Sequence, residues 1–156
     1  MSRFDIQRHY KSMMPLVELG KQVHSAGRLE PALIELVLMR CSQINGCAYC
    51  LDMHSKDARA AGESEQRIYA IPVWRETPFF TPRERAALAW TEAVTEISKG
   101  VSDEVFRETS EHFTDVELVN LTMAINAINA WNRISIALHS SEVGSYQPRV
   151  AATTHA

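Results

Sequence analysis

The chain of 156 residues is long enough for one domain with a substantial core, and its 46% hydrophobic and 22% charged residues are typical of a globular protein. A formal net charge of −3 gives no reason to expect a nucleic-acid or anionic-membrane partner. The first residues, MSRFDIQRHYK, are too polar for a signal peptide, and no apolar run approaches the ~20 residues that span a bilayer. Three cysteines suit a secreted disulfide framework poorly, so we expect a cytoplasmic protein.

Nearly every segment has the apolar periodicity of a helix, and no stretch alternates convincingly like a β-strand. We expect a first helix from Pro15 to about Ser25 and a second from Pro31 to about Ile44, because proline is favoured at the first helical position. The second helix ends at Asn45-Gly46, and a third runs from near Cys47 to Gly62. A fourth, capped by Ser64, extends to about Trp74.

Two capping boxes mark the second half of the chain. Thr81-Pro82-Arg83-Glu84 starts a fifth helix that runs to about Ser98, and Ser102 opens a short sixth. Thr114-Asp115-Val116-Glu117 starts a long seventh helix that reaches Leu138. The small and polar segment 140–156 predicts a flexible tail. The sequence therefore predicts one all-α domain over residues 1–156, with six or seven helices and a core at about 15–138.

A lone acid and a pair of thiols are predicted to meet across a helical hairpin. The turn at Asn45-Gly46 makes the second and third helices antiparallel. At a rise of about 1.5 Å per residue, Glu35 lies about 15 Å before this turn and His54 about 10.5 Å beyond Cys47, a difference of less than one helical turn. His54 follows Cys50 by four residues and Cys47 by seven, so these three share one helix face. Glu35, His54 and the two cysteines therefore converge.

This convergence favours dithiol redox chemistry. A thiol with a pKa near ~8.5 is mostly unreactive at neutral pH, but a helix N-terminus and a nearby imidazole both lower that pKa. Glu35 would orient His54 and stabilise its charged form. The second cysteine supplies a resolving thiol, which closes a disulfide on a sulfenic acid. We expect no metal and no organic cofactor.

Two alternative interpretations concern Cys41 and Glu35. A zinc site could be made of Cys41, Cys47, Cys50 and His54, although Cys41 would have to reach across the Asn45-Gly46 turn. Unpaired cysteine is usually buried, so we expect Cys41 to be a core residue. Glu35 could instead be a structural ion-pair partner of Arg40 or Arg133.

The last predicted helix is apolar but carries Asn126, Asn129, Asn132 and Arg133. Buried polar side chains need partners, so hydrogen bonds between helices or subunits are the plain interpretation. The functional alternative is that Asn129 or Arg133 lines the pocket next to Glu35. We expect the three tryptophans to pack in the core or in oligomer contacts.

The pattern Glu35, eleven residues, Cys47-x-x-Cys50, x-x-x-His54 resembles the signature of the alkylhydroperoxidase D family within the carboxymuconolactone decarboxylase superfamily. The stretches SQINGCAYCLDMHSKDARAAGE, RERAALAWTEAVTEI and NAWNRISIAL are similar to the shorter members. The resemblance covers about Pro15 to Leu138. It implies an all-α fold with the C-x-x-C motif at a helix N-terminus, and assembly into trimers or hexamers.

The resemblance also implies the reduction of small hydroperoxides through a thiol–disulfide cycle, with a lipoyl dithiol or a thioredoxin-like protein as electron donor. By position, Cys50 is the peroxidatic and Cys47 the resolving cysteine, while His54 and Glu35 form the proton relay. Cys47 is nearer the positive end of the helix dipole, but His54 lies one turn from Cys50. The chain departs from the best-known members at Tyr49, where they carry a further histidine.

Two further functions remain as alternatives to the peroxidase. A decarboxylase-like enzyme would use His54 and Glu35 for acid–base chemistry on a lactone. A zinc-binding or redox-sensing module would change its assembly or its partners instead of turning over a substrate.

Overall fold

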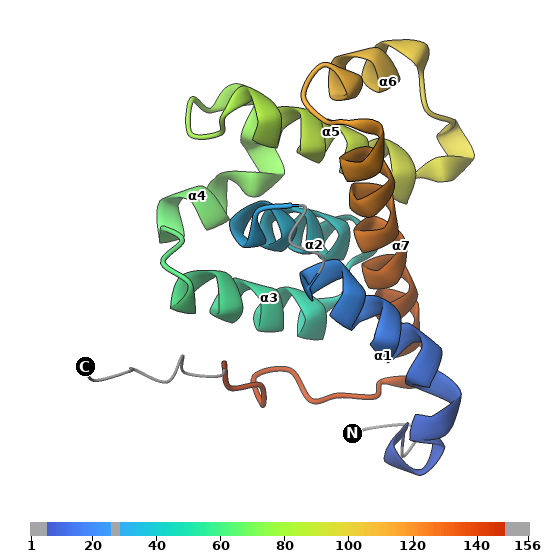
Figure 1. The fold of residues 1–156 in the computed structure, drawn as a ribbon. Helices are drawn as coiled ribbons and strands as arrows, with labels where there is room; N and C mark the ends of the chain where they lie inside the picture. The colour runs from blue at the N-terminus through green and yellow to red at the C-terminus, as the bar shows by residue number, and fades with distance from the viewer. Residues whose placement is uncertain (1–5, 26–28, 149–156) are drawn as a thin grey trace, which may run out of the picture.

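Helix α2 (Pro31–Asn45) runs through the centre of the molecule, with α3 (Ala48–Ala60) beside it and α7 (Asp115–Leu138) across it (Figure 1). The computed structural model describes residues 6–25 and 29–148, and within them every regular element is helical. The other helices are α1 (Tyr10–Ser25), α4 (Glu65–Ala70), α5 (Pro82–Thr95) and α6 (Asp103–Ser110), with short 3-10 helices η1 (Ile6–His9), η2 (Ile71–Glu76) and η3 (Ile97–Lys99). The all-α prediction is confirmed. None of the helices in the described part is long and apolar enough to cross a membrane.

The central position of α2 follows from its composition. Apolar residues surround it almost completely, and it packs against α3, α5 and α7 at once. Its two main faces belong to two core clusters, one with α5 and α7 around Val37 and one with α4 and η2 around Leu36. A helix that is apolar all round is stable only when it is covered on most sides. The lone acid on this helix, Glu35, is therefore held in a largely water-excluded layer.

The predicted hairpin between α2 and α3 is confirmed, and its turn has an identifiable cause. Gly46 adopts φ +71°, in the left-handed region where glycine avoids the penalty that other residues meet. The N–H of Cys47 then donates to the carbonyl of Ser42 at 2.9 Å. Cys47 is the N-cap of α3. The turn thus places the C-x-x-C motif at the N-terminus of a helix, as the sequence indicated.

Three predicted boundaries differ from the structure. Helix α1 begins at Tyr10 and contains Pro15, whereas we expected it to start at the proline. Helix α4 ends at Ala70 because Pro72 follows, and the chain continues as a 3-10 turn with a non-helical Val73. Helix α5 ends at Thr95 and is followed by η3. Both capping boxes, at Thr81 and at Thr114, are formed.

The segment after α7 lies along α3 as far as the structure describes it, although the sequence predicted a flexible tail from Ser140 (Figure 1). We call residues 140–146 the C-terminal strap. The hydroxyl of Tyr146 donates to the carboxylate of Asp57, and Lys56 donates to the carbonyl of Tyr146 at 3.0 Å. The N–H of Gly144 donates to Asp52 at 3.2 Å. Residues 149–156 of the predicted tail lie outside the described residues.

Candidate active site

The two cysteines of the motif form a disulfide at the start of α3. Their Cα atoms are 5.4 Å apart, and each residue is only 2% exposed. The N–H of Cys50 donates to the sulfur of Cys47 at 3.4 Å, so Cys47 caps the helix with its own side chain. The unpaired N–H groups of a first helical turn stabilise negative charge nearby. This end of α3 is therefore suited to hold a thiolate once the disulfide is reduced.

Glu35 and His54 meet across the hairpin. Nδ1 of His54 lies 3.0 Å from Oε2 of Glu35, and the side chains of His54 and Glu35 are 8% and 14% exposed respectively. With its proton on Nδ1, the imidazole donates to the carboxylate and keeps Nε2 as an available base. The convergence of Glu35 with the face of α3 that carries His54 is thus present in the structure.

The alternative ion-pair partners of Glu35 are engaged elsewhere. Arg40 pairs with Glu92 on α5, where Trp74 also donates its indole N–H to the same carboxylate. Arg133 donates to the backbone carbonyl of Asn129 at 2.8 Å. The structure therefore pairs Glu35 with His54 and supports neither arginine as its partner.

Cys41 lies apart from the disulfide, as a buried residue against α5. Its sulfur lies 3.3 Å from the hydroxyl oxygen of Thr95, and its exposure is 0%. Burial raises the pKa of its thiol to about 12, an effect that the Thr95 hydroxyl only partly offsets. Within residues 6–25 and 29–148, no three His, Cys, Asp or Glu side chains are placed to share a metal ion. The core interpretation of Cys41 agrees with this position, and the four-ligand zinc arrangement does not.

The asparagines of α7 form a buried network with the end of α2. Nδ2 of Asn45 donates to Oδ1 of Asn129 at 2.7 Å and to Oδ1 of Asn132 at 2.9 Å. Asn132 in turn donates to Ser42. Neither Asn129 nor Arg133 lines the cavity that contains Cys50 and His54. Their plain interpretation as hydrogen-bonding residues is the one that the structure supports, and the network fixes the turn before Cys47.

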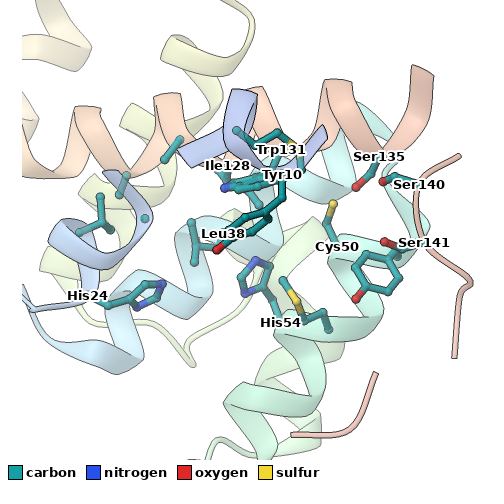
Figure 2. Close-up of a pocket in the computed structure, with 17 residues that line it drawn as sticks. Tyr10, His24, Leu38, Cys50, His54, Ile128, Trp131, Ser135, Ser140 and Ser141 are labelled. Carbon is teal, nitrogen blue, oxygen red and sulfur yellow. The ribbon is translucent and has the colours of Figure 1, made fainter. Parts of the chain in front are cut away.

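A cavity of about 400 Å³ opens beside Cys50 and His54. In Figure 2 the sulfur of Cys50 lies between Trp131 on one side and Ser140 on the other. Tyr49, the residue at which the chain departs from the best-known relatives, also lines it. The lining residues are Tyr10, Met13, Gly20, Val23 and His24 of α1; Leu38 of α2; Tyr49, Cys50, Met53 and His54 of α3; Ala124, Ala127, Ile128, Trp131 and Ser135 of α7; and Ser140 and Ser141 of the strap.

Two walls of this cavity were missed by the sequence reasoning. The α1 wall begins at Tyr10 and Met13, in a segment we had placed before the first helix. The spacing of Tyr10, Met13 and Val17 is helical and could have revealed it. The strap wall has no such local signal, because its contacts with α3 join residues about 90 positions apart, as between Lys56 and Tyr146.

Comparison with known proteins identifies the family of the chain. The model of the carboxymuconolactone decarboxylase family matches residues 12–93, which include α2, the disulfide and His54. The chain belongs to this family. A relative from Bacillus subtilis, the uncharacterized protein YdfG, is 51% identical over 129 residues, which are 82% of this chain and 85% of YdfG. This carboxymuconolactone decarboxylase family member is also 30% identical to the uncharacterized protein YnjA of Escherichia coli over 70% of this chain and 60% of YnjA.

Solved structures place the family member among the alkylhydroperoxidase D-like proteins. The Agrobacterium tumefaciens protein ATU0492, a protein of unknown function named as a candidate antioxidant defence protein AhpD, is 42% identical with a TM-score of 0.87 and covers 91% of this chain and 98% of its own. The debrominase Bmp8, as a variant in complex with 2,3,4-tribromopyrrole, has the same fold at 19% identity, with a TM-score of 0.81 over 90% of this chain and 74% of its own. An alkylhydroperoxidase AhpD core protein from Ralstonia eutropha shares the fold at 20% identity, with a TM-score of 0.76 over 87% of this chain and 73% of its own.

Proposed function

We propose that the protein is a thiol peroxidase that reduces organic hydroperoxides with the Cys47/Cys50 pair. The observation that carries the proposal is the position of this pair, at the N-terminus of α3, with Cys50 and the Glu35-bound His54 lining one cavity. A nucleophilic thiolate needs a group that removes its proton and a site that excludes bulk water. The shared cavity of His54 and Cys50, and the burial of Cys50, support this role for the pair.

In the first step the thiolate of Cys50 attacks the terminal oxygen of the hydroperoxide. The S–O bond forms as the O–O bond breaks, and the leaving alkoxide takes the proton that His54 had removed from the thiol. Sulfur has then given two electrons to the peroxide, and the products are a sulfenic acid and an alcohol. In the second step the thiol of Cys47 attacks the sulfenic sulfur, an S–S bond forms, and water leaves. The sum is one hydroperoxide and two thiols converted into an alcohol, water and a disulfide.

The assignment of roles within the pair is supported by the cavity. Cys50 lines it, whereas the sulfur of Cys47 receives the N–H of Cys50 at the helix cap. His54 follows Cys50 by one turn of the same helix, and Glu35 stabilises the imidazolium that forms while the proton is held. We therefore assign Cys50 as peroxidatic, Cys47 as resolving, and His54 with Glu35 as the proton relay.

The cycle needs an external dithiol to reduce the disulfide, and a lipoyl group or a thioredoxin-like protein has the required chemistry. A dithiol that must return to its reduced form in every turnover suits a reducing compartment such as the cytoplasm. We also propose a homo-oligomer, because α6 and α7 expose large apolar side chains at Phe106, Val119 and Met123. The family resemblance implies a trimer or a hexamer.

The test is a single turnover of the reduced protein with one equivalent of an organic hydroperoxide, followed by intact mass and thiol counting. The wild type is expected to form the Cys47–Cys50 disulfide quickly, and Cys50→Ser to leave the peroxide unconsumed. Cys47→Ser is expected to stop at the sulfenic acid, and His54→Ala to slow the reaction without abolishing it. Thiols that stay reduced under peroxide would refute the proposal.

The same variants separate the alternatives. An acid–base decarboxylase would retain its activity in Cys47→Ser, since its chemistry needs only His54 and Glu35. A redox-sensing module would oxidise once and not turn over when a dithiol is supplied. A parallel incubation with 2,3,4-tribromopyrrole tests whether the pair reduces a carbon–bromine bond, as the name of the debrominase that shares the fold suggests.

A further inference from the structure

The cavity beside Cys50 is lined almost wholly by apolar and aromatic groups. Among the described residues that line it, none is Asp, Glu, Lys or Arg, and its polar side-chain groups are hydroxyls, two imidazoles, the Trp131 indole and the Cys50 sulfur. An ionised substrate would lose its hydration there, which is costly, and these walls offer it no carboxylate, ammonium or guanidinium group, while the imidazole of His54 is already paired with Glu35. The cavity therefore suits an uncharged molecule.

Its volume and its walls also limit the shape of the occupant. A water molecule takes about 30 Å³ in the liquid, so about 400 Å³ holds roughly a dozen groups of that size. Tyr10 from α1 and Trp131 from α7 present aromatic rings to this space (Figure 2). Met53 also lines it and adds an adaptable side chain. Tyr10 is 46% exposed, so it lies at the mouth of the cavity and contributes little to the core. These groups favour a compact occupant that carries a ring.

The C-terminal strap closes the side of the cavity next to Cys50, through Ser140 and Ser141. It is held on α3 by side chains outside the cavity: Lys56 donates to the Tyr146 carbonyl, and Asp57 accepts from the Tyr146 hydroxyl. These bonds are at the surface or half-buried, so each contributes modestly. The strap is thus a wall that a few bonds keep in place.

We propose, on the basis of the peroxidase function above, that this cavity is the binding site of an uncharged, ring-bearing hydroperoxide of about a dozen non-hydrogen atoms, and that the strap sets the upper limit of its length. The redox step is the one written above: the terminal oxygen of this hydroperoxide goes to Cys50 and the ring-bearing alcohol leaves. Tyr10 acts as a specificity-determining residue, while Lys56 and Tyr146 position the strap.

The first test measures binding to the oxidised protein and needs no turnover. The probe is 2-phenyl-2-propanol, the alcohol formed from cumene hydroperoxide, and it is compared by calorimetry with tert-butanol, which lacks the ring, and with anionic 2-phenylpropanoate. The probe is expected to bind about tenfold more tightly than tert-butanol, because it buries one more ring. It is also expected to bind about tenfold more tightly than 2-phenylpropanoate, because the carboxylate loses its hydration in the cavity. Equal affinity for the three, or a preference for the anion, would overturn the proposal.

Tyr10→Ala is expected to weaken binding of 2-phenyl-2-propanol by about fivefold, because it removes one aromatic wall. The matched control is Tyr69→Ala, since Tyr69 is 70% exposed on α4 and does not line the cavity. An equal loss in both variants, or no loss in Tyr10→Ala, would remove Tyr10 from the specificity determinants.

The strap is tested by the single-turnover rate of the reduced protein with two uncharged oxidants, cumene hydroperoxide and the longer methyl ester of a linoleic acid hydroperoxide. The double variant Lys56→Ala/Tyr146→Phe removes the bonds from Lys56 and from the Tyr146 hydroxyl. It is expected to raise the rate with the long ester relative to cumene hydroperoxide by about threefold or more. An unchanged ratio means that the strap does not limit length.

The two measurements keep this proposal separate from the peroxidase function. Tight binding of the aromatic alcohol without peroxide consumption would refute the peroxidase and leave the cavity assignment standing. Fast oxidation of Cys50 without any preference for the uncharged aromatic probe would support the peroxidase and refute the cavity assignment.

Discussion

Nδ1 of His54 on α3 and Oε2 of Glu35 on α2 are 3.0 Å apart, although 19 positions separate the two residues in the chain. A carboxylate on one imidazole nitrogen fixes the tautomer and the orientation of the ring. Here that carboxylate comes from the buried central helix, so the orientation of the imidazole depends on the packing of α2 against α3. The other ring nitrogen, Nε2, is consequently positioned by the core of the fold.

The first prediction concerns the charge of this carboxylate. In Glu35→Gln the amide can still accept from Nδ1, but it no longer stabilises an imidazolium. Disulfide formation after one equivalent of hydroperoxide is therefore expected to slow by about 10- to 100-fold, with a shifted pH–rate profile, measured by stopped flow. Glu96→Gln, at a surface pair with Lys99, is the matched control. A Glu35→Gln variant with the wild-type rate and pH profile would exclude Glu35 from the relay.

The second prediction concerns the unpaired thiol. Burial raises the pKa of Cys41 from 9.0 to about 12, only partly offset by the hydrogen bond with Thr95. At pH 8 only about one Cys41 in ten thousand is then a thiolate, and the thiolate is the reactive form. Iodoacetamide is expected to leave Cys41 unmodified in the native protein and to label it fully in urea, as read by peptide mass spectrometry.

The raised pKa of Cys41 also makes the protein less stable at alkaline pH. Below pH 9 the Cys41 thiol is protonated in both the folded and the unfolded state. Its burial then makes its full contribution to the free energy of unfolding. As the pH rises from 9 toward 12 the unfolded chain loses the proton first, and that contribution declines. Cys41→Ala is expected to reduce this alkaline loss of stability. Rapid labelling of Cys41 in the native protein at pH 8 would contradict its buried position.

The elements that sequence patterns predicted well are those whose signals are local. The glycine after α2, the capping boxes before α5 and α7, and the spacing of Cys50 and His54 each act within a few residues, and each structural consequence followed. The contact between Glu35 and His54 was also predictable. In a tight antiparallel hairpin, residues at similar distances from the turn lie side by side on the two helices.

What could not be predicted depends on contacts between distant segments. Proline commonly starts a helix, yet α1, which packs on α7, begins at Tyr10 and continues through Pro15. A local preference contains no information about that packing. The strap is composed mainly of small polar residues typical of a tail, and Asp52, Lys56 and Asp57, on a helix far away in the chain, give it a place to bind.

The third prediction tests the polar network at the end of α2. Asn132 is fully buried and exchanges hydrogen bonds with Asn45 and Ser42, whereas Asn126 on the same helix is exposed. Asn132→Ala is expected to lower the free energy of unfolding by about 1–3 kcal/mol, because it leaves buried polar groups with fewer partners. Asn126→Ala is expected to change it by less than about 0.5 kcal/mol. Urea unfolding of both variants measures the difference, and equal effects would contradict the structural role of the network.

The fourth prediction concerns Glu92, which joins α5 to α2 and η2. Burial alone raises the pKa of this carboxyl, but hydrogen bonds from Trp74, Arg75 and Arg40 outweigh it and hold the pKa below its ordinary value of 4.5. A carboxyl with a lowered pKa in the folded state stabilises the fold above its unfolded pKa, and that stabilisation is lost as the pH falls through the folded value.

Glu92→Gln is therefore expected to lower the free energy of unfolding by about 2 kcal/mol at pH 7, since Arg40 loses the charge that it is paired with. The difference from wild type should shrink as the pH falls below 4.5, where the unfolded chain takes up the proton first, and should be lost below the lower pKa of Glu92 in the folded protein. Urea unfolding at several pH values measures this, with Glu96→Gln at an exposed pair as the control that changes little at any pH. If Glu92→Gln destabilises the protein equally at pH 7 and pH 3, the charge of Glu92 does not account for its role between α5, α2 and η2.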